Sequence, residues 1–164
     1  MVKIIYLAGG CFWGVEEYFS YIIGITDTQV GYANGVWNDP TYEDVCSGNS
    51  GFAETTKLTY DDAQVTLKEI LNHYFKIIDP TILNRQGFDS GTQYRTGIYF
   101  IDDYDKEIIT KYINSIKSNY NKPIVTEIMK LKNYFPAEDY HQKYLKKNPN
   151  GYCHIDISKV KNNS

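Results

Sequence analysis

A glycine-rich turn between a strand pattern and a helix pattern constrains this chain more than any other stretch of its sequence. Residues 4–8, IIYLA, form a short apolar run typical of a buried strand, and residues 15–23 repeat apolar side chains at helical spacing. The segment GGCFWG at 9–14 joins them, and its first two glycines allow a tight turn without a clash of Cβ atoms. The pattern predicts that Cys11 lies where a strand ends and a helix begins.

Cys11 occupies a position that favours a reactive thiol. A cysteine at a helix N-terminus meets unpaired N–H groups and the positive end of the helix dipole, which stabilise a thiolate. Phe12 and Trp13 would then line a pocket suited to a ligand with a small apolar group near its reactive centre. The alternatives stay open at this point, since a lone cysteine is commonly a small buried residue and aromatic pairs commonly belong to the core.

The composition narrows the classes of protein to which the chain can belong. Its 164 residues are 42% hydrophobic and 23% charged, which is ordinary for one globular domain. The net charge of -3 predicts neither a nucleic-acid partner nor a membrane surface, and no apolar run is long enough to span a bilayer. The N-terminus lacks a signal-peptide pattern, which predicts the cytoplasm. Three cysteines without CxxC or zinc spacing indicate thiol chemistry rather than a disulfide framework.

Strand and helix patterns alternate along the chain in the approximate order β-α-β-β-α-β-α-β-α. The two longest helix patterns after the first run from a cap at 61 or 62 to 77, and from a cap at 102 or 103 to 116. This alternation, with too few strands for a barrel, predicts an α/β (α+β) fold in which helices pack on a small mixed sheet. We expect one catalytic domain over residues 1–164, with a frayed tail at 158–164.

Two polar loops and one strand carry further candidate side chains. Glu54 opens an apolar strand, and burial beside aromatic rings would raise its pKa, so that a neutral carboxylic acid could donate a proton. Tyr42 and Tyr94 lie in the two loops and offer O–H donors. A solvated surface position is the alternative for Glu54, and a turn-forming role is the alternative for Asp89.

Cys153 lies near the C-terminus, in the segment GYCH. A second thiol on a mobile segment could reach a distant first one and form a disulfide, whereas a buried cysteine in a final strand is the alternative. Cys46 has no feature that marks it as reactive. The three histidines lack the spacing of a metal site. Helix patterns favour structural roles for His73 and His141, and the sequence does not decide the role of His154.

Taken together, these motifs resemble the peptide methionine sulfoxide reductase A family. The segment GCFWG matches that family's signature, and further blocks match in the same order over roughly residues 3 to 157. These blocks are Gly31-Tyr32, PTYEDVCSG at 40–48, Ala53-Glu54, GTQYR at 91–95, and EDYHQ at 138–142 with Tyr144-Leu145. The resemblance implies a two-layer α/β plait with a ferredoxin-like core, and no cofactor or metal.

The resemblance also implies a reaction, which is reduction of the S epimer of methionine sulfoxide, free or in proteins. Cys11 would attack the sulfoxide sulfur, while Phe12 and Trp13 would hold the methyl group of the substrate. Glu54 would protonate the sulfoxide oxygen, because that oxygen is a poor leaving group until it is protonated. A thiolate and a neutral carboxylic acid must then coexist at neutral pH.

The remaining matched positions imply supporting roles. Tyr42 and Tyr94 would hydrogen-bond the sulfoxide oxygen, and Asp89 would support substrate binding from the loop before Tyr94. One position departs from the family pattern, since Phe52 replaces the usual histidine two residues before Glu54. We therefore expect Glu54 to work in a drier setting.

Regeneration of the thiol follows from the same resemblance. Oxygen transfer would leave a sulfenic acid on Cys11, and Cys153 matches a position used in many members to form a disulfide with it. Thioredoxin, or a glutaredoxin-type reductant, would reopen that disulfide; direct resolution by glutathione or glutaredoxin is the alternative. Two other functions stay open, namely another thiol-based enzyme such as a peroxidase, and a non-catalytic binder of oxidised methionine.

Overall fold

The structure, a computed structural model that describes residues 1–162, is built on one six-stranded mixed sheet. The strands are β1 (Val2–Ala8), β2 (Ile25–Ala33), β3 (Ala53–Asp61), β6 (Gly97–Phe100), β7 (Glu127–Lys130) and β8 (Tyr134–Pro136). They lie in the order β7-β6-β1-β3-β2-β8. A separate hairpin pairs β4 (Arg85–Gln86) with β5 (Asp89–Ser90).

The helices fill the connections between these strands. They are α1 (Phe12–Ser20), α2 (Tyr42–Cys46), α3 (Leu67–Ile77), α4 (Asp103–Ile116), α5 (Tyr144–Lys147) and α6 (Ser158–Asn162). Three short 3-10 helices are η1 (Thr92–Tyr94), η2 (Lys117–Asn119) and η3 (Asp139–His141). The predicted polar loop before β3 thus contains a short helix, α2, which begins at Tyr42.

The central strands are connected as two split β-α-β units, β1-α1-β2 and β3-α3-β6. β1 pairs antiparallel with both β3 and β6, and β2 pairs antiparallel with β3. β7 adds in parallel to β6, and β8 adds antiparallel to β2, which makes the sheet mixed. The predicted α/β fold, a ferredoxin-like core with helices packed on a small mixed sheet, is confirmed.

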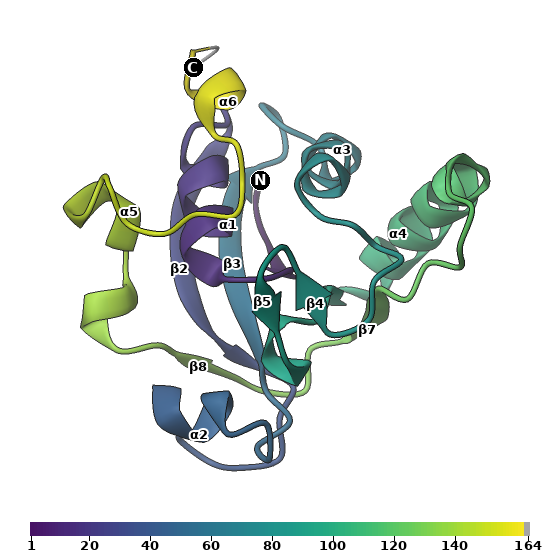
Figure 1. Ribbon diagram of the computed structural model, residues 1–164. Helices are drawn as coiled ribbons and strands as arrows, with labels where there is room; N and C mark the ends of the chain where they lie inside the picture. The colour runs from purple at the N-terminus through teal and green to yellow at the C-terminus, as the bar shows by residue number, and fades with distance from the viewer. Residues whose placement is uncertain (163–164) are drawn as a thin grey trace.

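One face of the sheet carries the main core, against which α1, α3 and α4 pack (Figure 1). Leu7 of β1 and Leu58 of β3 belong to this core together with Phe19 of α1. The opposite face carries a smaller cluster, in which the rings of Tyr6 and Tyr134 lie 5.0 Å apart between centroids. Side chains at alternate strand positions therefore divide between a helix-covered face and a second face.

Two of the boundaries that differ from the sequence prediction are the start of α3 and the C-terminal segment. β3 runs to Asp61, and α3 begins only at Leu67, because Thr66 and Glu69 form a capping box there. The carboxylate of Asp61 instead accepts from the N–H of Ala63 at 3.0 Å. The expected frayed tail is wrong for 158–162, which form α6 with Val160 in the main core, while 163–164 lie outside the described residues.

Tyr74 of α3 fixes the turn that carries Cys11. Its buried hydroxyl donates to the carbonyl of Ala8 and accepts from the N–H of Gly97 at 3.1 Å, which joins the end of β1 to the start of β6. Gly9 lies so close to α3 that a Cβ there would be 2.6 Å from Cγ2 of Ile78, and Gly10 has a φ of +74°. Both positions therefore require glycine, for different reasons.

We expect the substitution Tyr74→Phe to lower the free energy of unfolding by about 1–3 kcal/mol, because it removes a buried hydroxyl that serves two backbone groups. Urea unfolding followed by circular dichroism measures this change. The matched control is Tyr104→Phe, whose side chain is 63% exposed and should change stability by less than about 0.5 kcal/mol. Equal stability of the two variants would contradict the bridging role of Tyr74.

Candidate active site

Cys11 is the N-cap residue of α1, as the sequence predicts. Its backbone is extended, with φ -65° and ψ 126°, and its side chain makes no capping hydrogen bond. The preceding N–H of Gly10 donates to the carbonyl of Tyr94 at 3.1 Å, which ties the turn to η1. The residue is only 7% exposed, so the thiol sits at a helix start but inside the protein.

Glu54 lies on the sheet directly under the first turn of α1. Its Oε1 accepts from the backbone N–H of Phe12 at 3.2 Å, and the residue is 1% exposed. Oε2 has no hydrogen-bond partner among the described residues. A buried carboxyl oxygen without a partner is unusual in folded proteins, and it is consistent with a group that has a proton to exchange with a ligand.

Burial sets the protonation state of Glu54. It raises the pKa of the carboxyl to about 8, and the N–H of Phe12 only partly opposes this effect, while the negative charge of Asp89 adds to it. Phe52, 1% exposed, belongs to the same buried cluster as Phe12. Glu54 is therefore mainly a neutral carboxylic acid at pH 7, in the dry setting that the sequence predicts.

The same burial acts on the Cys11 thiol. It raises the pKa of the thiol well above its ordinary value; charge on Glu54 raises it further, and the backbone N–H of Trp13 lowers it. The N–H of Trp13 lowers the thiol pKa, as expected for a helix N-terminus, but burial raises it more, so the resting thiol does not become the expected thiolate. Desolvation outweighs the helix dipole here, so both the thiol and the acid hold their protons at neutral pH.

An aromatic cluster surrounds the sulfur. Phe12 is buried with Cys11, and Trp13, Tyr42 and Tyr94 pack against the cluster that these two residues form. Burial raises the pKa of both tyrosine hydroxyls well above the ordinary value, so both remain O–H donors. The structure thus brings together four aromatic side chains that the sequence singles out.

Two residues that the sequence assigns no catalytic part hold Trp13 in place. Its Nε1–H donates to Nδ1 of His141 at 3.0 Å, and its ring stacks on Tyr144 with 3.7 Å between centroids and 10° between planes. Burial lowers the pKa of His141, which keeps the imidazole neutral and able to accept this hydrogen bond. The helix pattern around His141 predicts a structural role, and in the structure that role is to orient the indole of Trp13.

Glu138 places the α2 segment on the site. One carboxylate oxygen accepts from the hydroxyl of Tyr32 at 2.8 Å, and the other accepts from the backbone N–H of Tyr42 at 3.0 Å. A capping box between Thr41 and Asp44 also fixes the start of α2. Tyr42 therefore projects from a short helix that is anchored at its first residue, although the sequence indicates only a polar loop.

Asp89 lies between the site and the C-terminal segment. Its Oδ2 accepts from the hydroxyl of Tyr152 at 3.1 Å and is 4.0 Å from Nδ1 of His154. Its charge also raises the pKa of Glu54 and of Tyr94. The carboxylate thus supports the site electrostatically while it holds the end of the chain.

Cys153 comes close to Cys11 through a glycine of α1. The chain after α5 crosses over α1 (Figure 1), and a Cβ on Gly14 would be 3.0 Å from Sγ of Cys153. Both thiols are free, and a charge on Cys153 would raise the pKa of Cys11. Sγ of Cys153 donates to the carbonyl of Ile155 at 3.2 Å. Gly14, which the sequence shows only as the end of GCFWG, leaves room for this sulfur.

The described part of the chain comprises residues 1–162. These residues contain no group of three or more His, Cys, Asp or Glu side chains that could hold a metal ion. They also contain no helix that is both long and apolar enough to cross a membrane.

Comparisons with known proteins confirm the resemblance to the reductase family. The family model described as "Peptide methionine sulfoxide reductase" matches residues 3–164. The peptide methionine sulfoxide reductase MsrA of Clostridium botulinum (strain Okra) is 58% identical to this chain, and the match covers 95% of this chain and 99% of the relative. The MsrA of Clostridium tetani is 59% identical, and the match covers 95% of this chain and 95% of the relative. Reduced Mxr1 from Saccharomyces cerevisiae superimposes with a TM-score of 0.90 at 39% identity, over 94% of this chain and 91% of that chain. Mxr1 in complex with Trx2 superimposes with a TM-score of 0.62 at 30% identity, over 87% of this chain and 84% of that chain.

Proposed function

Since the chain belongs to the peptide methionine sulfoxide reductase family, we propose that it is a cytoplasmic, single-domain enzyme that reduces methionine S-sulfoxide, free or in proteins. The observation that carries this proposal is the pairing of Cys11 with Glu54 at the start of α1. A buried thiol and a buried carboxylic acid with a pKa of about 8 lie at the start of α1, where one can attack sulfur while the other protonates oxygen.

In the first step, one oxygen atom passes from the substrate to Cys11, and two protons are transferred through Glu54. Sγ of Cys11 attacks the sulfoxide sulfur while Glu54 donates its proton to the sulfoxide oxygen. The S–S bond formed in this attack then breaks as the hydroxyl passes from the substrate sulfur to Sγ, which leaves a sulfenic acid on Cys11 and methionine as the product, and the thiol proton restores Glu54. Loss of the thiol proton during the attack, rather than before it, agrees with a resting thiol whose pKa is raised by burial.

The aromatic cluster orients the substrate for this step. Phe12 and Trp13 offer apolar surface for the methyl group beside Sγ of Cys11. Tyr42 and Tyr94 keep their protons and can donate to the developing hydroxyl on the substrate oxygen. Asp89 supports this arrangement through its charge on Glu54 and Tyr94.

A second step returns Cys11 to the thiol. Cys153 condenses with the Cys11 sulfenic acid to a disulfide, and an external dithiol then reduces it. The contact between Cys153 and Gly14 supports this pairing. Thioredoxin is the reductant we favour over glutaredoxin or glutathione, because the structural relative Mxr1 has been observed in complex with Trx2.

Separated epimers of methionine sulfoxide test the proposed reaction. The protein, with thioredoxin, thioredoxin reductase and NADPH, should reduce the S epimer, free and in a peptide, and leave the R epimer unchanged. Hydrogen peroxide serves as the control oxidant, since a peroxidase would consume it at least as fast. Equal rates with both epimers, or a preference for peroxide, would contradict the proposal.

We expect Cys153→Ser to leave the first step intact and to stop turnover with thioredoxin, because the sulfenic acid then has no partner thiol in place. In a single turnover without reductant, the variant should release about one methionine per protein. Mass spectrometry should show an oxidised Cys11 without the Cys11–Cys153 link.

Cys46→Ser is the matched control for this variant. Cys46 is exposed at the end of α2 and should not take part in the disulfide. The control should therefore turn over at the wild-type rate with thioredoxin. A Cys11–Cys46 disulfide in the wild-type protein would refute the assignment of Cys153.

A further inference from the structure

Phe88 is the most exposed of the large apolar side chains in the described part of the chain, since the residue is 96% exposed. It stands at the tip of the β4–β5 hairpin, where Gln86 pairs with Asp89 and only Gly87 and Phe88 form the loop. Gly87 has a φ of +60°, and a glycine at the first position of a two-residue loop is typical of a type II′ turn. The hairpin therefore holds a phenylalanine in solvent on a short turn of defined geometry.

The base of this hairpin is anchored through both of its strands. The side chain of Gln86, which is 4% exposed, accepts from the N–H of Asp79 and donates to the carbonyl of Asp79, each at 2.8 Å. The N–H of Gly91 donates to the carbonyl of Asn84 at 2.8 Å and closes the other end. A ring that is presented by an anchored hairpin can contact a partner at a low cost in conformational entropy.

The hairpin packs on the turn that carries Cys11. A Cβ on Gly10 would be 2.9 Å from Cβ of Gln86, so β4 lies directly against this turn. Two residues of chain span at most about 7 Å, which keeps the backbone of Phe88 within about 7 Å of Gln86. Phe88 therefore lies beside the residues that we propose to bind the sulfoxide.

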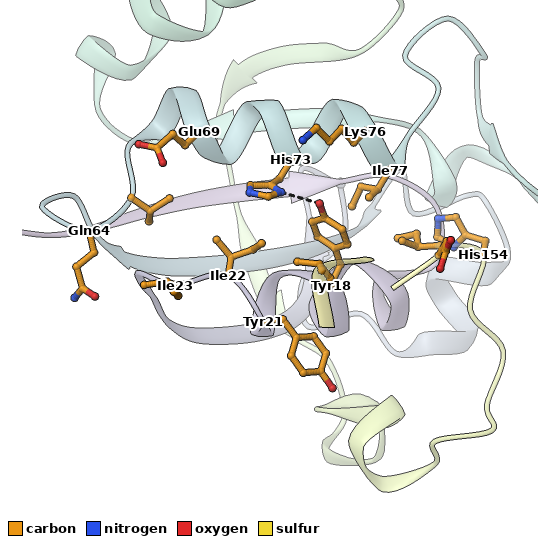
Figure 2. A pocket seen from close by; sticks show the side chains of 14 residues that line it. Tyr18, Tyr21, Ile22, Ile23, Gln64, Glu69, His73, Lys76, Ile77 and His154 are labelled. Atoms are coloured by element: carbon orange, nitrogen blue, oxygen red, sulfur yellow. Dashed lines mark hydrogen bonds between the residues drawn. The ribbon is translucent and has the colours of Figure 1, made fainter. Parts of the chain in front are cut away.

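The C-terminal segment supports the tip of the hairpin. Figure 2 shows His154 of this segment at one end of a cavity of about 930 Å³ that α1 and α3 also line. The hairpin meets the same residue, since a Cβ on Gly87 would be 3.3 Å from Cβ of His154 and 4.0 Å from the hydroxyl of Tyr152. That hydroxyl also donates to Oδ2 of Asp89 at 3.1 Å. These contacts hold the tip in place and leave the phenylalanine ring uncovered.

Single exposed apolar side chains are common on protein surfaces and need no function by themselves. Phe88 differs in its setting, because the hairpin that carries it contacts both the reactive turn and the segment that contains Cys153. A ring at the rim of the site can contact a residue that flanks methionine sulfoxide in a polypeptide. Free methionine sulfoxide has no such residue.

We propose that Phe88 makes the site prefer methionine sulfoxide in polypeptide segments with an apolar side chain nearby. This inference rests on the proposed function and names a substrate class for the same site. An extended chain rises about 3.3 Å per residue, so a segment whose sulfoxide lies at Cys11 passes Phe88 within about four residues. An apolar side chain there gains affinity by covering the ring. Folded proteins bury most such segments, so the preferred substrates are unfolded, oxidised chains.

Peptides with a central methionine S-sulfoxide test this proposal, when one phenylalanine is moved through the flanking positions of a glycine–serine host. In the wild-type protein, at least one position should raise kcat/KM by about 5- to 10-fold over the host peptide, mainly through KM. Phe88→Ser should lose this gain, while its rates with the host peptide and with free methionine sulfoxide stay within about twofold of wild type. Absence of a gain at every position in the wild-type protein, or an equal gain in Phe88→Ser, would overturn the proposal.

Two control variants separate an apolar contact from a general effect of substitution. Phe88→Leu keeps an apolar side chain at the tip and should keep most of the gain. Tyr104→Ser removes a 63% exposed ring from α4 and should keep all of it. Loss of the gain in Tyr104→Ser would contradict a contact that is specific to the hairpin.

The interface with the reductant is measured in the same variants. Thioredoxin must reach Cys153 near this hairpin, so its KM is determined with free methionine sulfoxide as the substrate and should not change in Phe88→Ser. A raised KM for thioredoxin, with the peptide gain unchanged, would assign the ring to the reductant and overturn the proposal. If the wild-type protein reduced neither free nor peptide sulfoxide, the proposed function itself would have failed.

Discussion

Replacement of Cys11 by serine is expected to abolish the reduction of methionine sulfoxide, by roughly 10⁴-fold or more. A serine hydroxyl is a far weaker nucleophile than a thiol, and Glu54 as a neutral acid cannot activate it as a base would. Methionine release in a single turnover, followed by chromatography, measures this effect. No oxidised protein should appear by mass spectrometry.

The fold should survive this substitution. Cys11 is the N-cap of α1 and makes no capping hydrogen bond, whereas serine is a preferred N-cap residue. The melting temperature of Cys11→Ser should therefore equal or exceed that of the wild-type protein. Cys46→Ser, on the exposed end of α2, should keep full activity and serves as the control. Methionine release by Cys11→Ser would show that another group attacks the sulfoxide.

Local patterns were sufficient to place the reactive turn. The apolar run before Gly9 and the helical spacing after Trp13 predict a strand-turn-helix, and the structure has β1 and α1 at these positions. Gly9 and Gly10 were expected for a tight turn, and the close approach of α3 together with a positive φ explains them. Such features depend on neighbours in sequence, so the sequence alone reveals them.

The environment of the sulfur depends on residues far apart in the chain, and there the sequence was insufficient. Tyr32, Val45 and Phe52 come from three separate segments and pack in the cluster that contains Cys11. Their combined burial raises the thiol pKa, an effect opposite to that expected from the helix dipole. A local motif shows that a cysteine is at a helix start but does not show how much water reaches it.

The same limit applies to the contacts between the ends of the chain. Cys153 approaches Cys11 because Gly14 has no side chain and because α6 folds back to place Val160 in the main core. Composition made the tail after 157 seem unstructured, since it is rich in Lys and Asn. Burial of one valine outweighs that composition, and no periodic pattern of five residues is long enough to predict it.

The acid of the first step has the second large expected effect. We expect Glu54→Gln to lower the rate of methionine release by roughly 10²- to 10⁴-fold, because an amide cannot give a proton to the sulfoxide oxygen. The amide oxygen can still accept from the N–H of Phe12, so the turn should keep its geometry. Glu16→Gln is the matched control, since Glu16 is 3% exposed but is hydrogen-bonded to Thr28 and Lys143 instead. An unchanged rate in Glu54→Gln would mean that another group supplies the proton.

The pH dependence gives two independent readings of the same carboxyl. Because Glu54 acts as an acid with a pKa of about 8, the wild-type rate of methionine release should fall as pH rises through that value.

The pKa of Glu54 in the folded state exceeds its ordinary value of 4.5, so the neutral form of this carboxyl stabilises the fold. That contribution to stability is complete below about pH 4.5 and is lost as pH rises through about 8. The wild-type melting temperature should therefore decline over this range, while Glu54→Gln lacks this contribution to the decline and is the more stable protein at pH 9. A rate that is level through pH 9 would contradict a neutral acid at this position, and so would a melting temperature whose pH dependence Glu54→Gln leaves unchanged.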